Sequence, residues 1–132
     1  MGRPMMQETL SISVHNGNVN VKRVRDAGYK RIIIRAGYGK NNVDQRFISN
    51  AEACVNLTEP AGIYWFSYAL NEEMAANEAL YAVAQAKKYW SKCPVAYDLE
   101  YDTVSYARKN GVSIGKAQAT AFAVAFLKEV IA

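Results

Sequence analysis

The sequence predicts an α/β fold of parallel βα units, about four of the eight that make up a TIM-like (β/α) barrel, in a single domain over residues 1–132. Three observations predict it. Short β-rich runs begin near residues 10, 31, 62 and 94, which is 21 to 32 residues apart and suits strands joined by right-handed crossovers. A segment with helical spacing follows each run. Because a complete barrel usually takes roughly 200 residues or more, this chain corresponds to half of one.

The first two units occupy the N-terminal third of the chain. Residues 9–17 (TLSISVHNG) form a short β-rich run that Asn-Gly closes, and residues 20–28 have helical apolar spacing before a glycine. Residues 29–39 contain three consecutive isoleucines, which is typical of a strand covered on both faces. Residues 44–57 can follow as a helix, with Asp44 as its N-cap.

The third and fourth units complete the predicted sheet. Residues 61–70 are β-branched and aromatic, and the alanine- and glutamate-rich residues 71–90 predict a long helix with Asn71 as its N-cap. Residues 94–102 (PVAYDLEYD) are the fourth strand. A polar loop then leads to a last helix over residues 113–132.

Composition and charge argue against several classes of protein. The chain is 51% hydrophobic and 21% charged, as globular domains are, and no run approaches the roughly 18 to 20 apolar residues of a membrane span. The first ten residues lack the apolar region of a signal peptide, so they do not predict export by that route. The net charge is +4, but the basic residues are scattered, so neither nucleic acid nor a membrane is expected as a partner. Two cysteines have neither metal-ligand nor CxxC spacing.

Two carboxylates interrupt the fourth strand near its carboxyl end. Ligands bind at this end of the strands in parallel α/β folds, and alternation along a strand places Asp98 and Glu100 on one face. Two close acids disfavour each other's ionisation, which can keep one protonated as a general acid while the other stays charged. Glycoside hydrolysis requires this division of roles. The same pair is also common as a solvated strand end, a helix cap or part of an ion pair.

Three segments, in this order and at these intervals, resemble the N-terminal half of glycoside hydrolase family 25, the bacterial and phage N-acetylmuramidases called Chalaropsis-type lysozymes. They are IIIRAGYGKNNVDQRFISN, AGIYWFSYALNEEMAANEA and PVAYDLEYD. The resemblance covers residues 9–132. It implies a β/α barrel that cleaves the β-1,4 bond between N-acetylmuramic acid and N-acetylglucosamine in peptidoglycan. The glycan strand is then the partner, the bacterial cell wall is the site of action, and no metal or organic cofactor is required.

The resemblance also assigns roles to the two acids. Glu100 matches the family's general acid, which protonates the leaving glycosidic oxygen. Asp98 matches the neighbouring carboxylate, which either steadies the substrate's acetamido group as it attacks the anomeric carbon or stabilises the oxocarbenium-like state directly. Both routes stay open.

Aromatic and basic residues on neighbouring strands are candidate substrate-binding residues. Tyr64, Phe66 and Tyr68 alternate on one face of the third strand, and with Tyr38 they could form a platform for sugar rings or simply pack in the core. Arg35 is expected to hold the two carboxylates by an ion pair. His15, the single histidine, lies in a predicted turn and is expected to be neither the acid nor the base.

Two departures from the family pattern bear on activity. Aligning on His15-Asn16-Gly17 places Ser11 where the family has an active-site aspartate. A serine hydroxyl supplies no negative charge to a cationic transition state, so the change is expected to cost on the order of a hundredfold in rate. The family's later strands have no counterpart within residues 1–132.

A half barrel has unpaired strand edges and an exposed inner face. We therefore expect a homodimer, or a partner chain that completes the barrel. Three functions stay open at this point: a lysozyme-like muramidase, a non-catalytic peptidoglycan or carbohydrate binder derived from the family, and a fragment that serves mainly in assembly.

Overall fold

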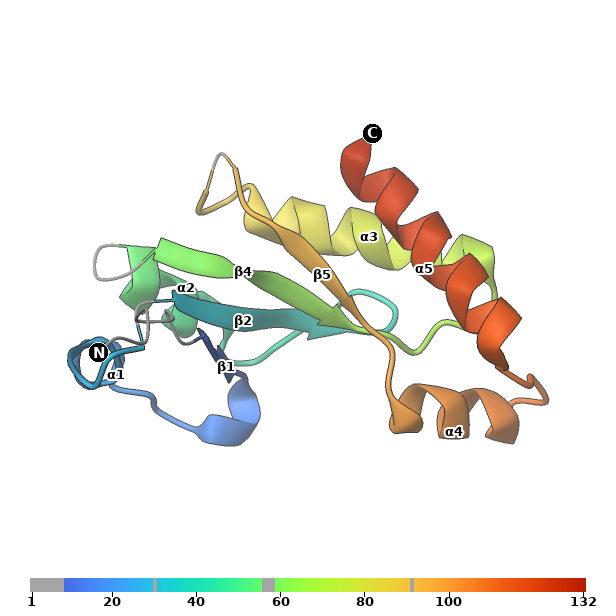
Figure 1. Cartoon of the computed structure of the whole chain (residues 1–132), viewed down its shortest axis with the longest axis horizontal. Helices are drawn as coiled ribbons and strands as arrows, with labels where there is room; N and C mark the ends of the chain where they lie inside the picture. The colour runs from blue at the N-terminus through green and yellow to red at the C-terminus, as the bar shows by residue number, and fades with distance from the viewer. Residues whose placement is uncertain (1–8, 30, 56–58, 91) are drawn as a thin grey trace, which may run out of the picture.

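The computed structural model describes residues 9–29, 31–55, 59–90 and 92–132. Its centre is one sheet in which four parallel strands lie in the order β1-β2-β4-β5, and a short strand β3 pairs antiparallel with β2 (Figure 1). Consecutive parallel neighbours are what successive βα units produce, so the predicted α/β class is confirmed. The strands are β1 (Thr9–Ile12), β2 (Arg31–Tyr38), β3 (Asn42–Val43), β4 (Glu59–Phe66) and β5 (Val95–Asp98).

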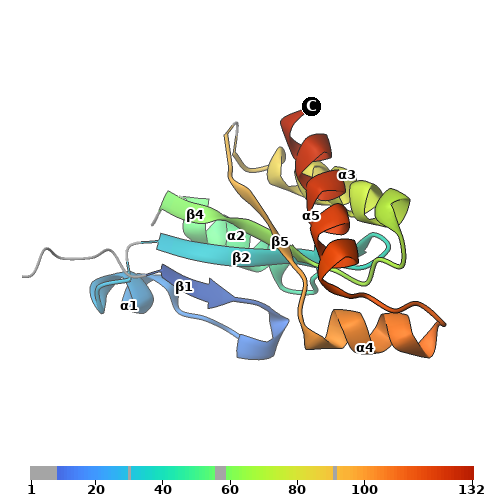
Figure 2. The ribbon, with the colours of Figure 1, turned by 45° about the vertical axis from the view of Figure 1, so that its right-hand side comes forward.

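The helices divide into a layer on one face of the sheet and two that lie outside this layer. Helices α2, α3 and α5 contact the strands, and α3 packs along α5 (Figure 2). By contrast, α1 lies beside β1, and α4 lies beyond the carboxyl ends of the strands (Figure 1). The helices are α1 (Val21–Asp26), α2 (Phe47–Val55), α3 (Glu72–Ala86), α4 (Tyr101–Lys109) and α5 (Lys116–Ile131), with a 3₁₀ turn η1 (Val14–Asn16) after β1.

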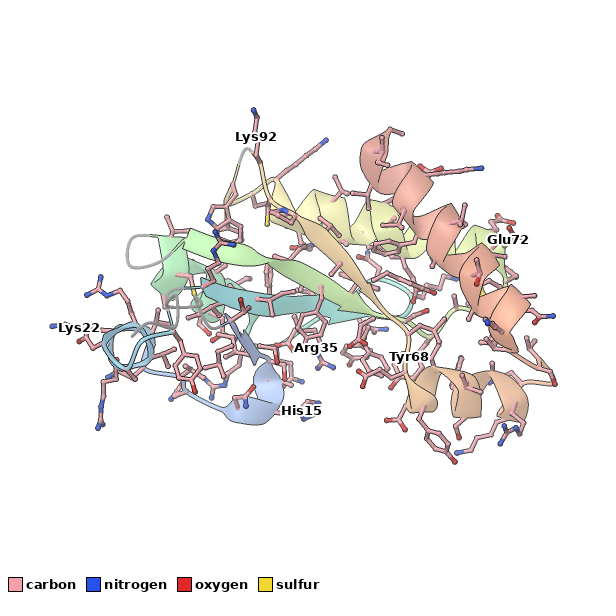
Figure 3. All side chains as sticks on the ribbon, in the orientation of Figure 1. His15, Lys22, Arg35, Tyr68, Glu72 and Lys92 are labelled. Atoms are coloured by element: carbon pink, nitrogen blue, oxygen red, sulfur yellow. The ribbon has the colours of Figure 1, made fainter. Side chains whose placement is uncertain are left out.

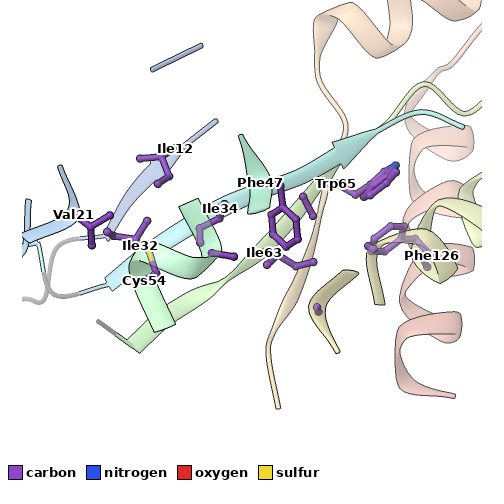
Figure 4. Close-up of a cluster of buried hydrophobic side chains, with 14 residues drawn as sticks. Ile12, Val21, Ile32, Ile34, Phe47, Cys54, Ile63, Trp65 and Phe126 are labelled. Atoms are coloured by element: carbon purple, nitrogen blue, oxygen red, sulfur yellow. The ribbon is translucent and has the colours of Figure 1, made fainter. Parts of the chain in front are cut away.

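The core lies between the sheet and this helix layer. Alternate residues of β2 and β4 point toward the helices, and Ile32, Ile34, Ile63 and Trp65 are fully buried. They meet side chains of α2, α3 and α5, including Phe47 and Phe126 (Figure 4). Burying each large apolar side chain contributes about 1.5–3 kcal/mol. This packing holds the sheet against one helix layer and leaves the other face of the same strands uncovered by it.

The fourth strand is shorter than predicted, and a helix follows it that the sequence analysis missed. We expected a strand over residues 94–102 and then a polar loop, but β5 ends at Asp98 and α4 occupies Tyr101–Lys109. Glu100 is the N-cap of this helix and has an extended backbone. Thr103 and Ala107, one helical turn apart, are its buried residues, so the apolar stripe is too narrow to be recognised as a helix.

Other boundaries differ by a few residues. The last helix begins after Gly115 rather than near Ser113, the third helix ends at Ala86, and the third strand ends at Phe66. The predictions for residues 1–8, for residue 30 and for residues 56 and 57 lie outside the described residues. Within the described part of the chain, no helix is both long enough and apolar enough to span a membrane. The described strands form an open sheet, with β1 and β5 at its edges.

Gly37 permits the close approach of β2 to β3 and to the indole of Trp65. A Cβ atom at this position would clash with the carbonyl oxygen of Asn42 and would lie 2.5 Å from the Trp65 ring. The indole cannot move away easily, because its Nε1–H donates a hydrogen bond to the Gly39 carbonyl at 3.0 Å.

We therefore expect Gly37→Ala to lower the free energy of unfolding by about 3 kcal/mol, since overpacking a filled core forces backbone shifts. The control is Gly115→Ala, where the nearest atom is the flexible end of Gln118 and the expected loss is under about 1 kcal/mol. Urea denaturation of both variants measures the difference. Equal losses would contradict the close-packing argument.

Candidate active site

The face of the sheet opposite the helix layer carries an open groove. Ser11, Ile33 and Tyr64 of its lining alternate with buried core residues, so the two-residue period of the strands places them here. Tyr97 borders the groove and also packs against the core. Asp98 lies at the carboxyl end of β5, next to Phe66 of β4 in the sheet register. The groove is lined by Ser11, Ile33, Tyr64, Ala96, Tyr97, Asp98 and Glu100.

The structure brings the two predicted acids together in this groove, but not by alternation along one strand. Asp98 is the last residue of β5, and Glu100 reaches the groove because the N-cap of α4 keeps an extended backbone. The two carboxyl groups share a hydrogen bond. Asp98 is half-buried and Glu100 is exposed, so Glu100 is the more accessible of the two.

The pKa of Asp98 is raised from its ordinary value to about 7. Burial is the main cause, and the hydrogen bond with Glu100 and the negative charge of that residue raise the pKa further. The positive charge of Arg35 acts in the opposite direction. Near neutral pH the pair can therefore hold a proton, which is what a site that donates protons to a substrate needs.

Arg35 is ion-paired with Asp44, not with the groove carboxylates as the sequence analysis expected. Its Nε lies 2.8 Å from Asp44 Oδ2, and both residues are buried. Among the described residues, no ion pair joins Arg35 to Asp98 or Glu100, so Arg35 acts on Asp98 only through space. The reason is proximity: β3 turns back beside β2 and carries Asp44 next to Arg35.

The prediction that Asp44 is the N-cap of the second helix is wrong, because α2 begins at Phe47. Asp44 precedes the first residue of α2 by three positions, and its carboxylate also accepts hydrogen bonds from the backbone N–H groups of Val14 and Arg46. These bonds tie the turn after β1 to the start of α2. Asp44 thus joins β2, the turn after β1 and the start of α2.

The predicted aromatic platform divides into two parts. Tyr64 lines the groove near Ser13, and burial raises its pKa. Phe66 and Tyr68 instead pack together, with ring centroids 5.2 Å apart. Tyr68 also makes edge contacts with Tyr38 and Tyr106, and we call these four residues the aromatic cluster: Tyr38, Phe66, Tyr68 and Tyr106. Sequence reasoning missed Tyr106 because it missed α4.

A second hollow lies beside the aromatic cluster. Val14, His15, Arg35, Tyr38, Gln45 and Tyr68 line it. The guanidinium of Arg35 lies over the Tyr38 ring, 5.0 Å from its centroid. Figure 3 shows His15, Arg35 and Tyr68 on the same side of the sheet. Gln45 was not predicted, and no motif in the sequence would have indicated it.

A buried polar network supports the end of β4, and the sequence analysis did not predict it. The Ser67 hydroxyl donates to Glu78 Oε1 at 2.8 Å, and the Tyr68 N–H donates to Glu78 Oε2 at 2.9 Å. The Tyr97 hydroxyl lies 2.8 Å from the Ser67 hydroxyl. Burial raises the pKa of Glu78 to about 7, and the two hydrogen bonds oppose this increase. Glu78 showed in the sequence only as a polar residue within an alanine-rich helix.

No group of three or more potential metal ligands of the His, Cys, Asp or Glu type comes together in the described part of the chain.

Comparison of the sequence with protein-family models matches the chain to one family, described as Glycosyl hydrolases family 25, over residues 10–132. A comparison with curated protein sequences gives no match.

Solved structures share the fold at low sequence identity. The autolysin LytC from Streptococcus pneumoniae, in complex with a synthetic peptidoglycan ligand, superposes with a TM-score of 0.78 and 24% identity over 93% of this chain and 29% of its own. A family 25 glycosyl hydrolase from Bacillus anthracis gives 0.72 and 19% identity over 92% and 54%. The catalytic domain of endolysin ply40 from bacteriophage P40 of Listeria monocytogenes gives 0.62 and 23% identity over 84% and 62%. The chain thus spans less than two thirds of each of these proteins.

We expect Glu100→Gln to lower the pKa of Asp98 from about 7, because it removes a neighbouring negative charge while leaving the burial of Asp98 in place. Titration of the Asp98 carboxyl carbon by NMR measures the change. Asp102→Asn removes a carboxylate from the first turn of α4 that does not act on Asp98, and it should leave the titration unchanged. Identical curves for the wild type and Glu100→Gln would contradict the contact between the two carboxyls.

Glu78 should make stability fall as the pH rises. Its pKa in the folded state lies above its ordinary value of 4.5, so the folded state binds the proton more tightly than the unfolded state does. The resulting stabilisation is complete below about pH 4.5 and lost by about pH 7, which amounts to on the order of 3 kcal/mol in the free energy of unfolding. Asp98 acts in the same direction.

Denaturant unfolding between pH 4 and pH 8 tests this dependence. Glu78→Gln should flatten it, leaving the part that Asp98 contributes, whereas Glu73→Gln, an exposed position on the same helix, should not. An unchanged slope in Glu78→Gln would show that Glu78 does not hold the proton.

Proposed function

The chain belongs to glycosyl hydrolase family 25, and from this membership we propose that it provides the acid pair of a peptidoglycan-hydrolysing glycoside hydrolase. One observation supports the proposal most directly. Asp98 and Glu100 share a hydrogen bond in an open groove at the carboxyl end of β5, where burial and mutual repulsion keep a proton on the pair near neutral pH. Glycosidic bond cleavage needs such a proton for the leaving oxygen.

The finer proposal is N-acetylmuramidase activity on the β-1,4 bond between N-acetylmuramic acid and N-acetylglucosamine. Glu100 is the more exposed acid, and we assign it the donation to the leaving oxygen. As the C–O bond breaks, the proton that Asp98 holds passes along the shared hydrogen bond to Glu100 and from Glu100 to the leaving oxygen, so both carboxyls become negative. They then face the positive charge that develops at the anomeric carbon. Asp98 stabilises this charge directly or through the substrate's acetamido group, and water completes the hydrolysis.

The remaining predicted residues are proposed glycan contacts. Tyr64 and Ser11 line the groove beside the acids. The aromatic cluster supplies apolar ring surface for sugar faces, with Tyr38 and Tyr68 lining the adjacent hollow. Arg35 lines the hollow, and its positive charge partly opposes the rise in the pKa values of Asp98 and Tyr64. The proposed partner is therefore a glycan strand of the bacterial cell wall.

A non-catalytic peptidoglycan or carbohydrate binder is the second candidate, and Ser11 favours it. This exposed side chain lies in the groove with Asp98 and Glu100, where the family resemblance places an aspartate. A hydroxyl cannot stabilise a cationic transition state as a carboxylate does. The groove would then bind sugar through its tyrosines without efficient turnover.

We also propose that the open sheet is covered in solution by a second copy of the chain or by a partner chain. Among the described strands, β1 and β5 each have a neighbour on one side only. Large apolar side chains of α5 are exposed, with Val124 at 43%, Leu127 at 46% and Ile131 at 85%. Exposed strand edges and apolar surface favour association.

The first experiment on function compares the wild type with Glu100→Gln on purified peptidoglycan, with released reducing ends identified by mass spectrometry. We expect muramic-acid reducing ends from the wild type and a rate lower by about a hundredfold or more in the variant, since general acid catalysis contributes about 10²–10⁴-fold. Asp102→Asn is the matched control, because it changes a nearby carboxylate outside the groove lining.

The outcome separates the two candidate functions. If the folded wild type releases no reducing ends but binds soluble muropeptides, the enzymatic function is contradicted and the non-catalytic binder is supported. In that case Ser11→Asp tests the cause, because restoring the charge should raise turnover by on the order of a hundredfold if its absence is the limit.

Sedimentation velocity tests the proposed assembly. We expect the isolated chain to sediment as a dimer at micromolar concentration, and Leu127→Lys with Ile131→Lys to shift it toward monomer by placing charge on the apolar surface. A monodisperse wild-type monomer would remove the proposal of self-association and leave only a partner chain.

A further inference from the structure

Building on the proposed function, we propose that Ser67 and Thr103 form a positioning unit that sets the placement of Asp98 relative to Glu100. Neither residue lines the groove, and the sequence analysis singled out neither. Both are completely buried, Ser67 directly after β4 and Thr103 in the first turn of α4.

The backbone of Ser67 links the end of β5 to the start of α4. Its N–H donates to the Asp98 carbonyl at 2.8 Å, and its own carbonyl accepts a hydrogen bond from Thr103 Oγ1 at 2.7 Å. The same Thr103 oxygen accepts the Glu100 N–H at 3.1 Å. A chain of three hydrogen bonds therefore joins the backbone of Asp98 to the backbone of Glu100.

This link spans the point where the chain changes from strand to helix. A single residue, Leu99, separates the two acids, and it packs in a small apolar cluster with Phe122. Without the Thr103 hydroxyl, the Glu100 N–H and the Ser67 carbonyl would each lose a hydrogen bond at a site shielded from water. The backbone between Asp98 and Glu100 could then change its conformation.

The Ser67 side chain is anchored as well. Its hydroxyl donates to Glu78, lies 2.8 Å from the Tyr97 hydroxyl, and accepts the Ala69 N–H at 3.1 Å. Three elements therefore hold Ser67: α3 through Glu78, β5 through Tyr97 and Asp98, and α4 through Thr103. These contacts hold the Ser67 peptide in place, and this peptide in turn positions the backbones of Asp98 and Glu100.

The placement affects the chemistry because the two carboxyls share a hydrogen bond, which is lost with small displacements. The charged and titratable groups that act on Asp98 or respond to it are Glu100, Arg35 of β2 and Tyr64 of β4. Thr103 is neutral, and its hydroxyl bonds to two backbone groups, the Ser67 carbonyl and the Glu100 N–H. A change at Thr103 therefore alters the titration of Asp98 by moving Asp98 and Glu100 relative to each other.

The test compares Thr103→Val, which keeps the shape but removes the hydroxyl, with Thr103→Ser, which keeps the hydroxyl. The control is Thr120→Val on α5, an exposed threonine whose hydroxyl also donates to a backbone carbonyl, that of Lys116 at 2.9 Å. The first readout is the titration of the Asp98 carboxyl by NMR. The second is kcat and KM for peptidoglycan.

We expect Thr103→Val to lower the pKa of Asp98 from about 7 toward the ordinary aspartate range, because Glu100 moves away. The kcat should fall by about tenfold or more with KM changed less than about twofold, since misplaced catalytic groups affect the chemical step. Thr103→Ser and Thr120→Val should match the wild type in both. A folded Thr103→Val with wild-type titration would overturn the positioning role.

The titration does not depend on turnover, so the two proposals can fail separately. If the wild type is inactive but the titration of Asp98 shifts in Thr103→Val, the positioning role is supported and the enzymatic function is contradicted. If Thr103→Val turns over peptidoglycan at the wild-type rate, the positioning role is contradicted and the enzymatic function is supported. Thr103→Ala provides a smaller replacement if Thr103→Val does not fold. If neither folds while Thr103→Ser does, Thr103 acts in folding and the positioning role is overturned.

Discussion

The packing of one sheet face against a single helix layer is the constraint on which the rest of this structure depends. Ile32, Ile34, Ile63 and Trp65 are buried against α2, α3 and α5, and the loss of apolar surface to water is the main force that holds these elements together. Because side chains alternate along a strand, this burial also decides what the opposite face presents. The groove that contains Asp98 is therefore a direct consequence of how the core is packed.

Polar groups are buried at the carboxyl end of the sheet, and almost all of those described have partners. Arg35 and Asp44 neutralise each other, and the Asp44 carboxylate also accepts two backbone N–H groups. Ser67 and Glu78 satisfy each other in the same way at the end of β4. A buried charge or hydroxyl without a partner would cost several kcal/mol, so these networks also hold the loops around the groove in one arrangement.

The proposed site raises a chemical question that the family and the fold do not answer. The raised pKa of Asp98 arises from burial and from Glu100, both of which belong to this chain. The proposed reaction also requires stabilisation of a cationic transition state, and Ser11 would provide it less well than an aspartate. For that reaction, this groove is better suited to proton donation than to charge stabilisation.

The sequence by itself determined the order of parallel strands and helices, the position of Asp98 and Glu100 near the carboxyl end of the fourth parallel strand, and the resemblance to family 25. Local periodicity and motif spacing carry this information. Only the tertiary structure decided that Glu100 caps α4, that Arg35 pairs with Asp44 instead of the groove acids, and that Tyr64 lies apart from Phe66 and Tyr68. It also brought Ser67 to Thr103, 36 residues later in the chain. Such partners are chosen by which buried polar atoms meet after the helices pack, and no local pattern in the sequence records that choice.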